Sequence, residues 1–180
     1  MKKLAALLTL AFTVMLSIVG TSSSGAFAKG INSVSHSFSS NGSGTETSLS
    51  GVGCQFTPAG CTVQTSGTAT SSHLGTGPYT TTLTVLWSQA TPNGDGGYCA
   101  PATGPSTLTA ANGDQLDLQN TGTVCEVGPT GNNAPHTFTG TYTITGGTGR
   151  FTRASGSGSL TGGDDGQGNS NYSASGTISY

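Results

Sequence analysis

Residues 142–160 read YTITGGTGRFTRASGSGSL, and this stretch decides the fold that the sequence predicts. Before the central glycines, Phe138, Tyr142 and Ile144 share one parity and alternate with polar residues or glycine. After the glycines, small residues and Leu160 share one parity in the same way. Alternation is typical of a β-strand with one buried face, and clustered glycines supply the positive φ angles that turns require. The segment therefore predicts two antiparallel strands around a glycine-rich turn, and with them an all-β protein.

The N-terminus has the pattern of an export signal. Two lysines precede an apolar run at residues 4–19, and the segment 26–28 (Ala-Phe-Ala) has small residues where signal peptidase cleaves. We expect residues 1–28 to be a cleaved signal peptide, which leaves residues 29–180 as a single secreted β-barrel domain. No second apolar run follows, so the sequence predicts no membrane span in the mature chain.

Charge is scarce in the predicted mature chain. Only Lys29, Arg150 and Arg153 remain beyond the signal peptide, against seven acidic residues. The net charge is therefore about −4 before any histidine is protonated. Because so few cations cannot neutralise a row of phosphates, we expect no nucleic-acid partner and no binding to a membrane surface through basic residues.

Eight segments of the mature chain have the alternation and the content of Thr, branched and aromatic residues that strands show. They are residues 31–39, 62–70, 79–89, 105–111, 114–124, 137–145, 151–161 and 172–180. The stretches 40–61 and 90–104 are predicted to be long loops, and 162–171 a glycine-rich turn. Eight antiparallel strands favour closure into a barrel, because closure removes the exposed edges of a sheet.

One hairpin has a register that the sequence can predict. Residues 111–113 (Ala-Asn-Gly) suit a three-residue loop with the glycine in the left-handed conformation. That loop places Leu108 opposite Leu116 on one face of the sheet. The same register places Cys99 opposite Cys125, within reach of a disulfide.

Four cysteines in an exported chain favour two disulfides. The hairpin register predicts a Cys99–Cys125 bridge, and elimination then predicts a Cys54–Cys61 bridge. A zinc site is the less favoured alternative, because the cysteines do not form close Cys-x-x-Cys pairs. We therefore predict no metal site.

Residues at inward parities are the candidate ligand contacts. They are His36, Tyr79, Trp87, Tyr142 and Tyr172. We expect the aromatic side chains to fill the barrel, because eight strands enclose little more than their own side chains. The alternative is that they line a small apolar pocket. His36 is either a hydrogen-bonded structural histidine or a ligand contact in the lumen.

The other ionisable residues do not indicate a catalytic constellation. His136 begins a predicted strand, and we expect it to be structural or solvated. Glu46 lies in a predicted loop and Asp164 in the glycine-rich turn, so they indicate no acid–base pair. Because no nucleophile elbow and no phosphate-binding loop occurs, the sequence predicts no cofactor and assigns no catalytic residue.

The central turn resembles that of a known family. Residues 146–156 follow the pattern Gly-Gly-Thr-Gly-x-Phe-x-x-Ala-x-Gly, which resembles the turn of the allene oxide cyclase and dirigent barrels. Residues 72–79 and 101–114 are similar to segments of small exported bacterial proteins with the same turn. The resemblance implies an eight-stranded antiparallel barrel that holds an apolar small molecule, as the cyclases and dirigent proteins do during ring closure or radical coupling. The matching residues belong to the turn and its packing, so the resemblance implies no catalytic residue in this chain.

These observations lead us to expect a secreted, disulfide-bonded β-barrel that binds a small apolar ligand without catalysis. One alternative is a cofactor-free cyclase or isomerase that confines an apolar substrate near His36, Trp87 and Tyr142. Another is an extracellular surface or interaction protein whose Thr-rich outer strands contact polymers or other proteins.

Overall fold

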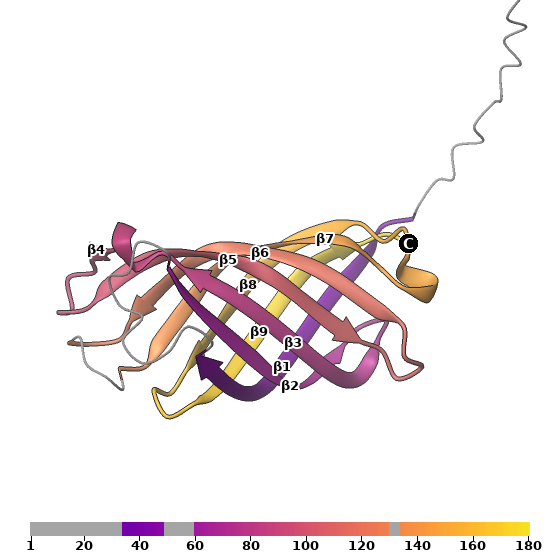
Figure 1. Cartoon of the computed structure of the whole chain (residues 1–180). Coiled ribbons are helices and arrows are strands. Elements are labelled where there is room, and N and C mark those ends of the chain that lie inside the picture. The colour runs from indigo at the N-terminus through magenta and orange to yellow at the C-terminus, as the bar shows by residue number, and fades with distance from the viewer. Residues whose placement is uncertain (1–33, 49–59, 130–133) are drawn as a thin grey trace, which may run out of the picture. The chain divides into compact units, whose positions relative to one another are not determined.

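The computed structural model describes residues 34–48, 60–129 and 134–180, and these residues form a closed β-barrel (Figure 1). Its strands are β1 (His36–Ser48), β2 (Cys61–Ser71), β3 (Gly75–Val85), β5 (Tyr98–Thr109), β6 (Gln115–Glu126), β7 (His136–Gly147), β8 (Gly156–Asp164) and β9 (Asn169–Ile178). Neighbouring strands are antiparallel in the order β3-β2-β1-β9-β8-β7-β6-β5, and a further pairing of β3 with β5 closes the sheet. A two-residue strand, β4 (Thr91–Pro92), pairs with the start of β5 outside the barrel. The predicted eight-stranded antiparallel barrel is confirmed.

The β5–β6 hairpin has the predicted register. Leu108 lies opposite Leu116, and Cys99 lies opposite Cys125. Gly113 closes the loop with a φ of 89°, which a residue with a side chain adopts only at a cost. The Cys99–Cys125 disulfide is present, as the register predicts. Such a bond is consistent with an oxidising, extracellular environment.

Other sequence predictions lie partly or wholly outside the described residues. Cys61 is disulfide-bonded, but its predicted partner Cys54 is not among the residues that the structure describes. The predicted signal peptide, residues 1–28, is not among them either. In the described part of the chain, no helix is both long enough and apolar enough to cross a membrane.

Strands extend into segments that the sequence predicted to be loops or turns. The predicted turn at 162–171 is shorter than expected, because β8 runs to Asp164 and β9 begins at Asn169. β1 continues to Ser48, and β5 begins at Tyr98 and runs through Pro101 and Pro105. A proline lacks the N–H group that a sheet ladder needs. β5 accommodates both prolines because neither is paired with a residue of β3. The β3–β5 ladder is interrupted at Pro105 and ends before Pro101.

The glycine-rich segment at residues 142–160 forms a wider connection than a tight turn. β7 ends at Gly147, the 3-10 helix η2 (Gly149–Phe151) follows, and β8 begins at Gly156 instead of residue 151. Phe151 is completely buried, and its ring centroid lies 5.1 Å from that of Tyr180. This connection therefore packs against one end of the barrel, which we call the closed end and which lies near the C-terminus in Figure 1.

Glycines face one another across neighbouring strands in the barrel wall. Gly158 lies opposite Gly176, and Gly122 lies opposite Gly140. A Cβ atom at Gly176 would come within 2.2 Å of the Ser157 carbonyl oxygen, so no other residue fits there without movement of the backbone. Such glycine pairs let neighbouring strands bend sharply, as a small barrel requires.

Each of these glycine pairs also makes room for an aromatic ring. A Cβ atom at Gly158 or Gly176 would lie 2.6 Å from the Tyr142 hydroxyl oxygen. At Gly122 and Gly140 the corresponding distances to Cζ of Phe138 are 2.7 and 2.9 Å. The two rings therefore lie against the barrel wall instead of extending across the lumen.

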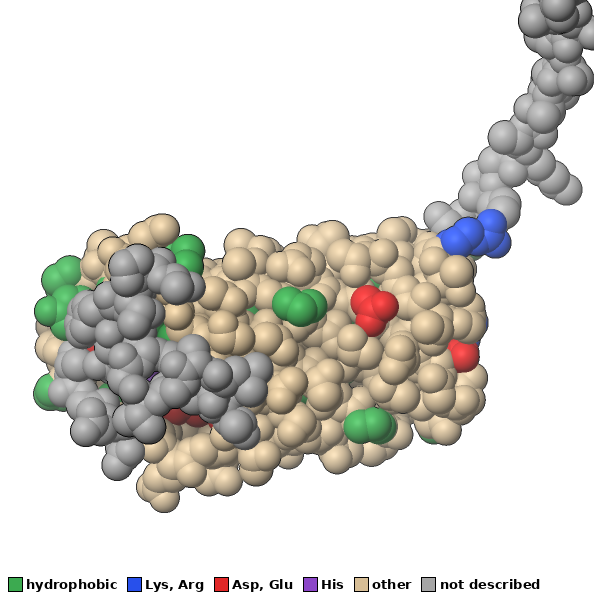
Figure 2. All heavy atoms as spheres, in the orientation of Figure 1, with side chains coloured by type: hydrophobic (Ala, Val, Ile, Leu, Met, Phe, Trp, Pro, Cys, Tyr) green, Lys and Arg blue, Asp and Glu red, His purple; other side chains and the backbone are tan. Residues whose placement is uncertain are grey.

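The outer faces of the strands are dominated by Ser, Thr, Asn and Gln, and charged side chains are few. On the side of the molecule drawn in Figure 2, acidic and basic groups are few and lie apart from one another. Thr has a branched β-carbon and a hydroxyl group, so it suits a strand face that is in contact with water. The outer face is therefore polar without being highly charged.

The Gly176→Ala substitution tests the close contact of the glycine pairs. We expect it to lower the free energy of unfolding by about 2–3 kcal/mol, because the new methyl group overlaps the Ser157 carbonyl and the Tyr142 hydroxyl. Ser173→Ala, at an exposed position of the same strand, is the control and should change stability by less than about 0.5 kcal/mol. Chemical denaturation measures both, and equal stability of the two variants would contradict the described contact.

Candidate ligand-binding cavity

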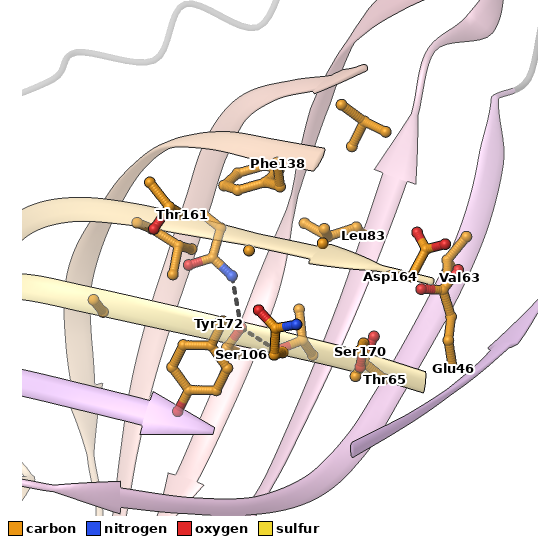
Figure 3. A pocket seen from close by; sticks show the side chains of 18 of the residues that line it. Glu46, Val63, Thr65, Leu83, Ser106, Phe138, Thr161, Asp164, Ser170 and Tyr172 are labelled. Carbon is orange, nitrogen blue, oxygen red and sulfur yellow. Dashed lines mark hydrogen bonds between the residues drawn. The ribbon is translucent and has the colours of Figure 1, made fainter. Parts of the chain in front are cut away.

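The lumen of the barrel holds a cavity of about 430 Å³ (Figure 3). The sequence favoured an interior filled by aromatic side chains, and the structure corrects that expectation. Many inward positions carry small residues, including Ser40, Thr65, Thr81 and Ser106, which leave the centre of the barrel empty. The aromatic rings line the space that remains.

One end of the cavity is lined by Trp87, which shortly precedes β4 in the chain, and we call this the rim end. Its wall there is a continuous cluster of hydrophobic side chains. The members are Val63, Leu83, Val85, Trp87, Phe138 and Leu160. An apolar wall of this kind favours the hydrocarbon part of a ligand through the hydrophobic effect.

Polar side chains from several strands lie deeper in the lumen. The Asn120 side-chain amide donates a hydrogen bond of 2.6 Å to Oγ of Ser106, which is also bonded to the Thr81 hydroxyl at 2.7 Å (Figure 3). On the other side of the lumen, Oγ of Ser40 is bonded to the Tyr172 hydroxyl at 2.8 Å. Ser40 and Asn120 are buried and the other three side chains are half-buried, and all have hydrogen-bond partners. They can therefore orient a polar group of a ligand without a cost of their own in the empty barrel.

Tyrosine and phenylalanine rings pack at the inner end of the cavity. The ring centroids of Tyr79 and Tyr172 are 5.0 Å apart, and those of Phe38 and Tyr142 are 5.7 Å apart, both in edge-to-face arrangements. Burial raises the pKa of Tyr142 to about 12. Burial likewise raises the pKa of Tyr172 to about 12. Both phenols are therefore neutral at physiological pH.

The Tyr142 hydroxyl is buried, and it forms no hydrogen bond with any residue that the structure describes. It lies against Gly158 and Gly176, whose missing side chains leave space for the ring. A buried polar atom without a partner costs free energy. The aromatic ring therefore fits the space at this position, and the hydroxyl adds no stabilising hydrogen bond.

Three ionisable side chains line the cavity at the rim end. Nδ1 of His136 donates to Oδ2 of Asp164 at 3.0 Å, which fixes the orientation of both groups. This hydrogen bond is the main reason that the pKa of His136 lies above its ordinary value. Burial, and then the neighbouring charge of Asp164, raise the pKa of the Glu46 carboxyl. Figure 3 shows Glu46 and Asp164 together at one end of the cavity.

A further carboxylate, Glu126, does not line the cavity but lies close to His136. Its side chain is 3% exposed, and Oε2 accepts a hydrogen bond of 3.0 Å from the Tyr98 backbone amide. Its charge contributes to the raised pKa of His136. We call Glu46, Glu126 and Asp164 the acidic rim.

The structure brings together four of the five predicted ligand contacts. Tyr79, Trp87, Tyr142 and Tyr172 all line the cavity. Trp87 reaches it from the 3-10 helix η1 (Trp87–Gln89), just beyond β3, and not from within a strand as predicted.

His36 is the predicted contact that does not line the cavity. It shares the inward parity of Phe38, but it stands at the first residue of β1 and is exposed at the closed end. There its ring centroid lies 5.6 Å from that of His73 and 6.2 Å from that of Tyr180. Its parity therefore does not bring it into the lumen, because it lies at the end of a strand.

Sequence reasoning missed the ionisable group at the rim. His136 has the parity of Phe138, and Glu46 has the parity of Phe38, so alternation could have indicated both as inward residues. Glu46 escaped notice because the glycines near it suggested a loop, although this part of β1 pairs with β2 and β9. Among the described residues, no group of three or more His, Cys, Asp or Glu side chains is arranged to hold a metal ion.

The Tyr142→Phe substitution tests the unpartnered hydroxyl. We expect the variant to be as stable as the parent protein, or more stable by up to about 1 kcal/mol, because no hydrogen bond is lost. Tyr172→Phe is the matched control and should cost about 1 kcal/mol, because it breaks the bond to Ser40. A larger loss for Tyr142→Phe than for Tyr172→Phe in thermal or chemical denaturation would contradict this assignment.

The Glu46→Gln substitution tests the electrostatics of the rim. Because the pKa of Glu46 is raised in the folded protein, its ionisation destabilises the fold as pH rises through that pKa. We expect Glu46→Gln to match the parent below about pH 4, where both side chains are neutral, and to be more stable than the parent at pH 7. Asp95→Asn, at an exposed acidic residue, should show no such pH-dependent gain. A stability difference that does not change with pH would contradict the raised pKa.

No protein-family model matches this chain, and no curated protein and no solved structure matches it at a significant level.

Proposed function

We propose that the protein is a secreted β-barrel that binds a small, mainly apolar molecule in its lumen without a cofactor. The observation that carries this proposal is the cavity of about 430 Å³ in a barrel narrow enough for side chains to fill. A protein without a ligand gains stability when its interior is packed, because voids forfeit contacts between atoms. An interior built from Ser, Thr and Gly at inward positions is therefore better explained by a ligand than by stability.

The lining of the cavity supports the same proposal. Ligand sites typically enclose about 300–1,000 Å³, with apolar walls and a few polar groups that fix orientation. Trp87, Leu83 and Phe138 supply the apolar wall here, and Ser106 and Tyr172 supply polar atoms deeper in the lumen. The resemblance of residues 146–156 to the turn of the allene oxide cyclase and dirigent barrels is in agreement, since those barrels hold apolar molecules. The disulfide supports the secreted location.

A cofactor-free cyclase or isomerase is the second candidate. The observation that favours it is His136, which lines the cavity and is held in place by Asp164. A histidine with a carboxylate partner can accept or donate a proton beside a bound substrate. The binding function does not require this chemistry, so it remains the leading proposal.

Trp87 offers a direct readout, because it is the single tryptophan of the sequence and lines the cavity. We expect 1-octanol, a neutral apolar probe, to change the emission of Trp87 in a saturable manner. Thr65→Phe should abolish the change, because the added ring occupies the lumen. Thr68→Phe places the same ring at an exposed position of the same strand and should leave the change intact. Equal responses of the two variants, or no saturable response of the parent protein, would contradict the proposed function.

A further inference from the structure

We infer that the ligand carries a positively charged amine, whose ammonium group lies at the acidic rim while its hydrocarbon part occupies the apolar cavity. This inference rests on the proposed binding function and specifies the chemical class of the ligand. It follows from the distribution of charge around the cavity, from the surroundings of Glu46 and from the aromatic wall beside it.

The charged groups around the cavity are mostly acidic. Glu46 and Asp164 line it, and Glu126 lies close enough to act on the pKa of His136. Among the described residues that line the cavity, His136 is the only group that can carry a positive charge. Lysine is absent from the described part of the chain. The barrel therefore presents an excess of negative charge to whatever enters at this end.

The two arginines of the mature chain are remote from the rim. Arg150 lies at the closed end, where its side chain donates to the His73 carbonyl oxygen and its guanidinium carbon is 4.8 Å from the centre of the Phe151 ring. Arg153 follows η2 in the same connection, before β8 begins. Neither arginine lines the cavity, so neither offsets the acidic rim.

Glu46 is the group whose charge is least compensated. Asp164 is held by two hydrogen bonds, from Nδ1 of His136 at 3.0 Å and from the Gly166 backbone amide at 2.8 Å. Within the described residues, by contrast, the Glu46 carboxylate accepts no hydrogen bond and forms no ion pair. Burial and the charge of Asp164 both oppose its ionisation, and the charge of His136 offsets them only in part. A cation between these carboxylates would compensate both effects, whereas an anion would add to the repulsion.

The apolar wall next to the rim suits the rest of such a molecule. Trp87 lies beside His136, with 6.0 Å between the ring centroids. Val63 and Leu83 pair across β2 and β3 and line the cavity at the same end. The face of an indole ring attracts cations through the cation–π interaction. Its large apolar surface also packs favourably against hydrocarbon. A primary amine on an alkyl or aryl body therefore matches both the charge and the apolarity of this site.

The test compares three probes with the same hydrocarbon chain at pH 7. They are octylamine, which is protonated, 1-octanol, which is neutral, and octanoate, which is anionic. Titration of Trp87 fluorescence should show that octylamine binds about tenfold more tightly than 1-octanol, with octanoate the weakest. The preference for the amine should decrease as salt is added, because it depends on charge at a partly exposed site.

Two variants locate the effect. Glu46→Gln should reduce the ratio of amine affinity to alcohol affinity about fivefold. Asp95→Asn removes an equal charge at an exposed position that does not line the cavity, and it should leave the ratio unchanged. Equal affinity for octylamine and 1-octanol, preference for octanoate, or the same change of ratio in both variants would overturn the inference while leaving the proposed binding function intact. Failure of 1-octanol and octylamine alike to bind would overturn the binding function as well.

Discussion

The contact between aromatic rings and cross-strand glycine pairs is the constraint on which the rest of the barrel depends. Gly158 and Gly176 bring two strands so close that a Cβ atom would overlap a carbonyl oxygen, and the Tyr142 ring covers them. Gly122 and Gly140 receive Phe138 in the same manner. Bending at these pairs allows a closed sheet, and it also keeps large rings against the wall. The same contact therefore explains both the closure of the barrel and the space at its centre.

The two ends of the barrel differ in their chemical environment. Hydrophobic side chains and the acidic rim meet at one end, whereas the closed end is packed with residues such as Leu116, Phe151 and Ile178. Polar groups lie between them and satisfy one another, as Asn120 and Ser106 do. A molecule that enters this lumen meets charge at the rim and neutral hydrogen-bonding groups farther in. This gradient is the physical basis for the ligand class that we infer.

Much of the fold could be predicted because local patterns determine it. Alternation identified most of the strands, and the Ala-Asn-Gly loop at residues 111–113 determined a register that correctly paired Cys99 with Cys125. The extents of β1 and β5 were less predictable, because Gly44 and Pro101 have loop propensities that pairing with neighbouring strands overrides. Propensity describes an isolated segment, whereas a closed sheet supplies partners from both sides.

The candidate site was predictable only in part. Parity places a side chain on the inner or outer face, and it correctly identified Tyr79, Trp87 and Tyr172 as inward. It does not give the height of a residue along the barrel axis, so His36 was expected in a lumen that it does not reach. The meeting of Glu46 with His136 depends on strands distant in sequence, whose order around the barrel no local pattern contains.

Nuclear magnetic resonance of the ligand-free barrel tests the central claim most directly. We predict contacts from the Tyr142 ring to the α-protons of Gly158 and Gly176, and from the Phe138 ring to those of Gly122 and Gly140. Contacts from the same rings to side chains on the opposite wall would contradict this arrangement, since the rings would then cross the lumen and fill it.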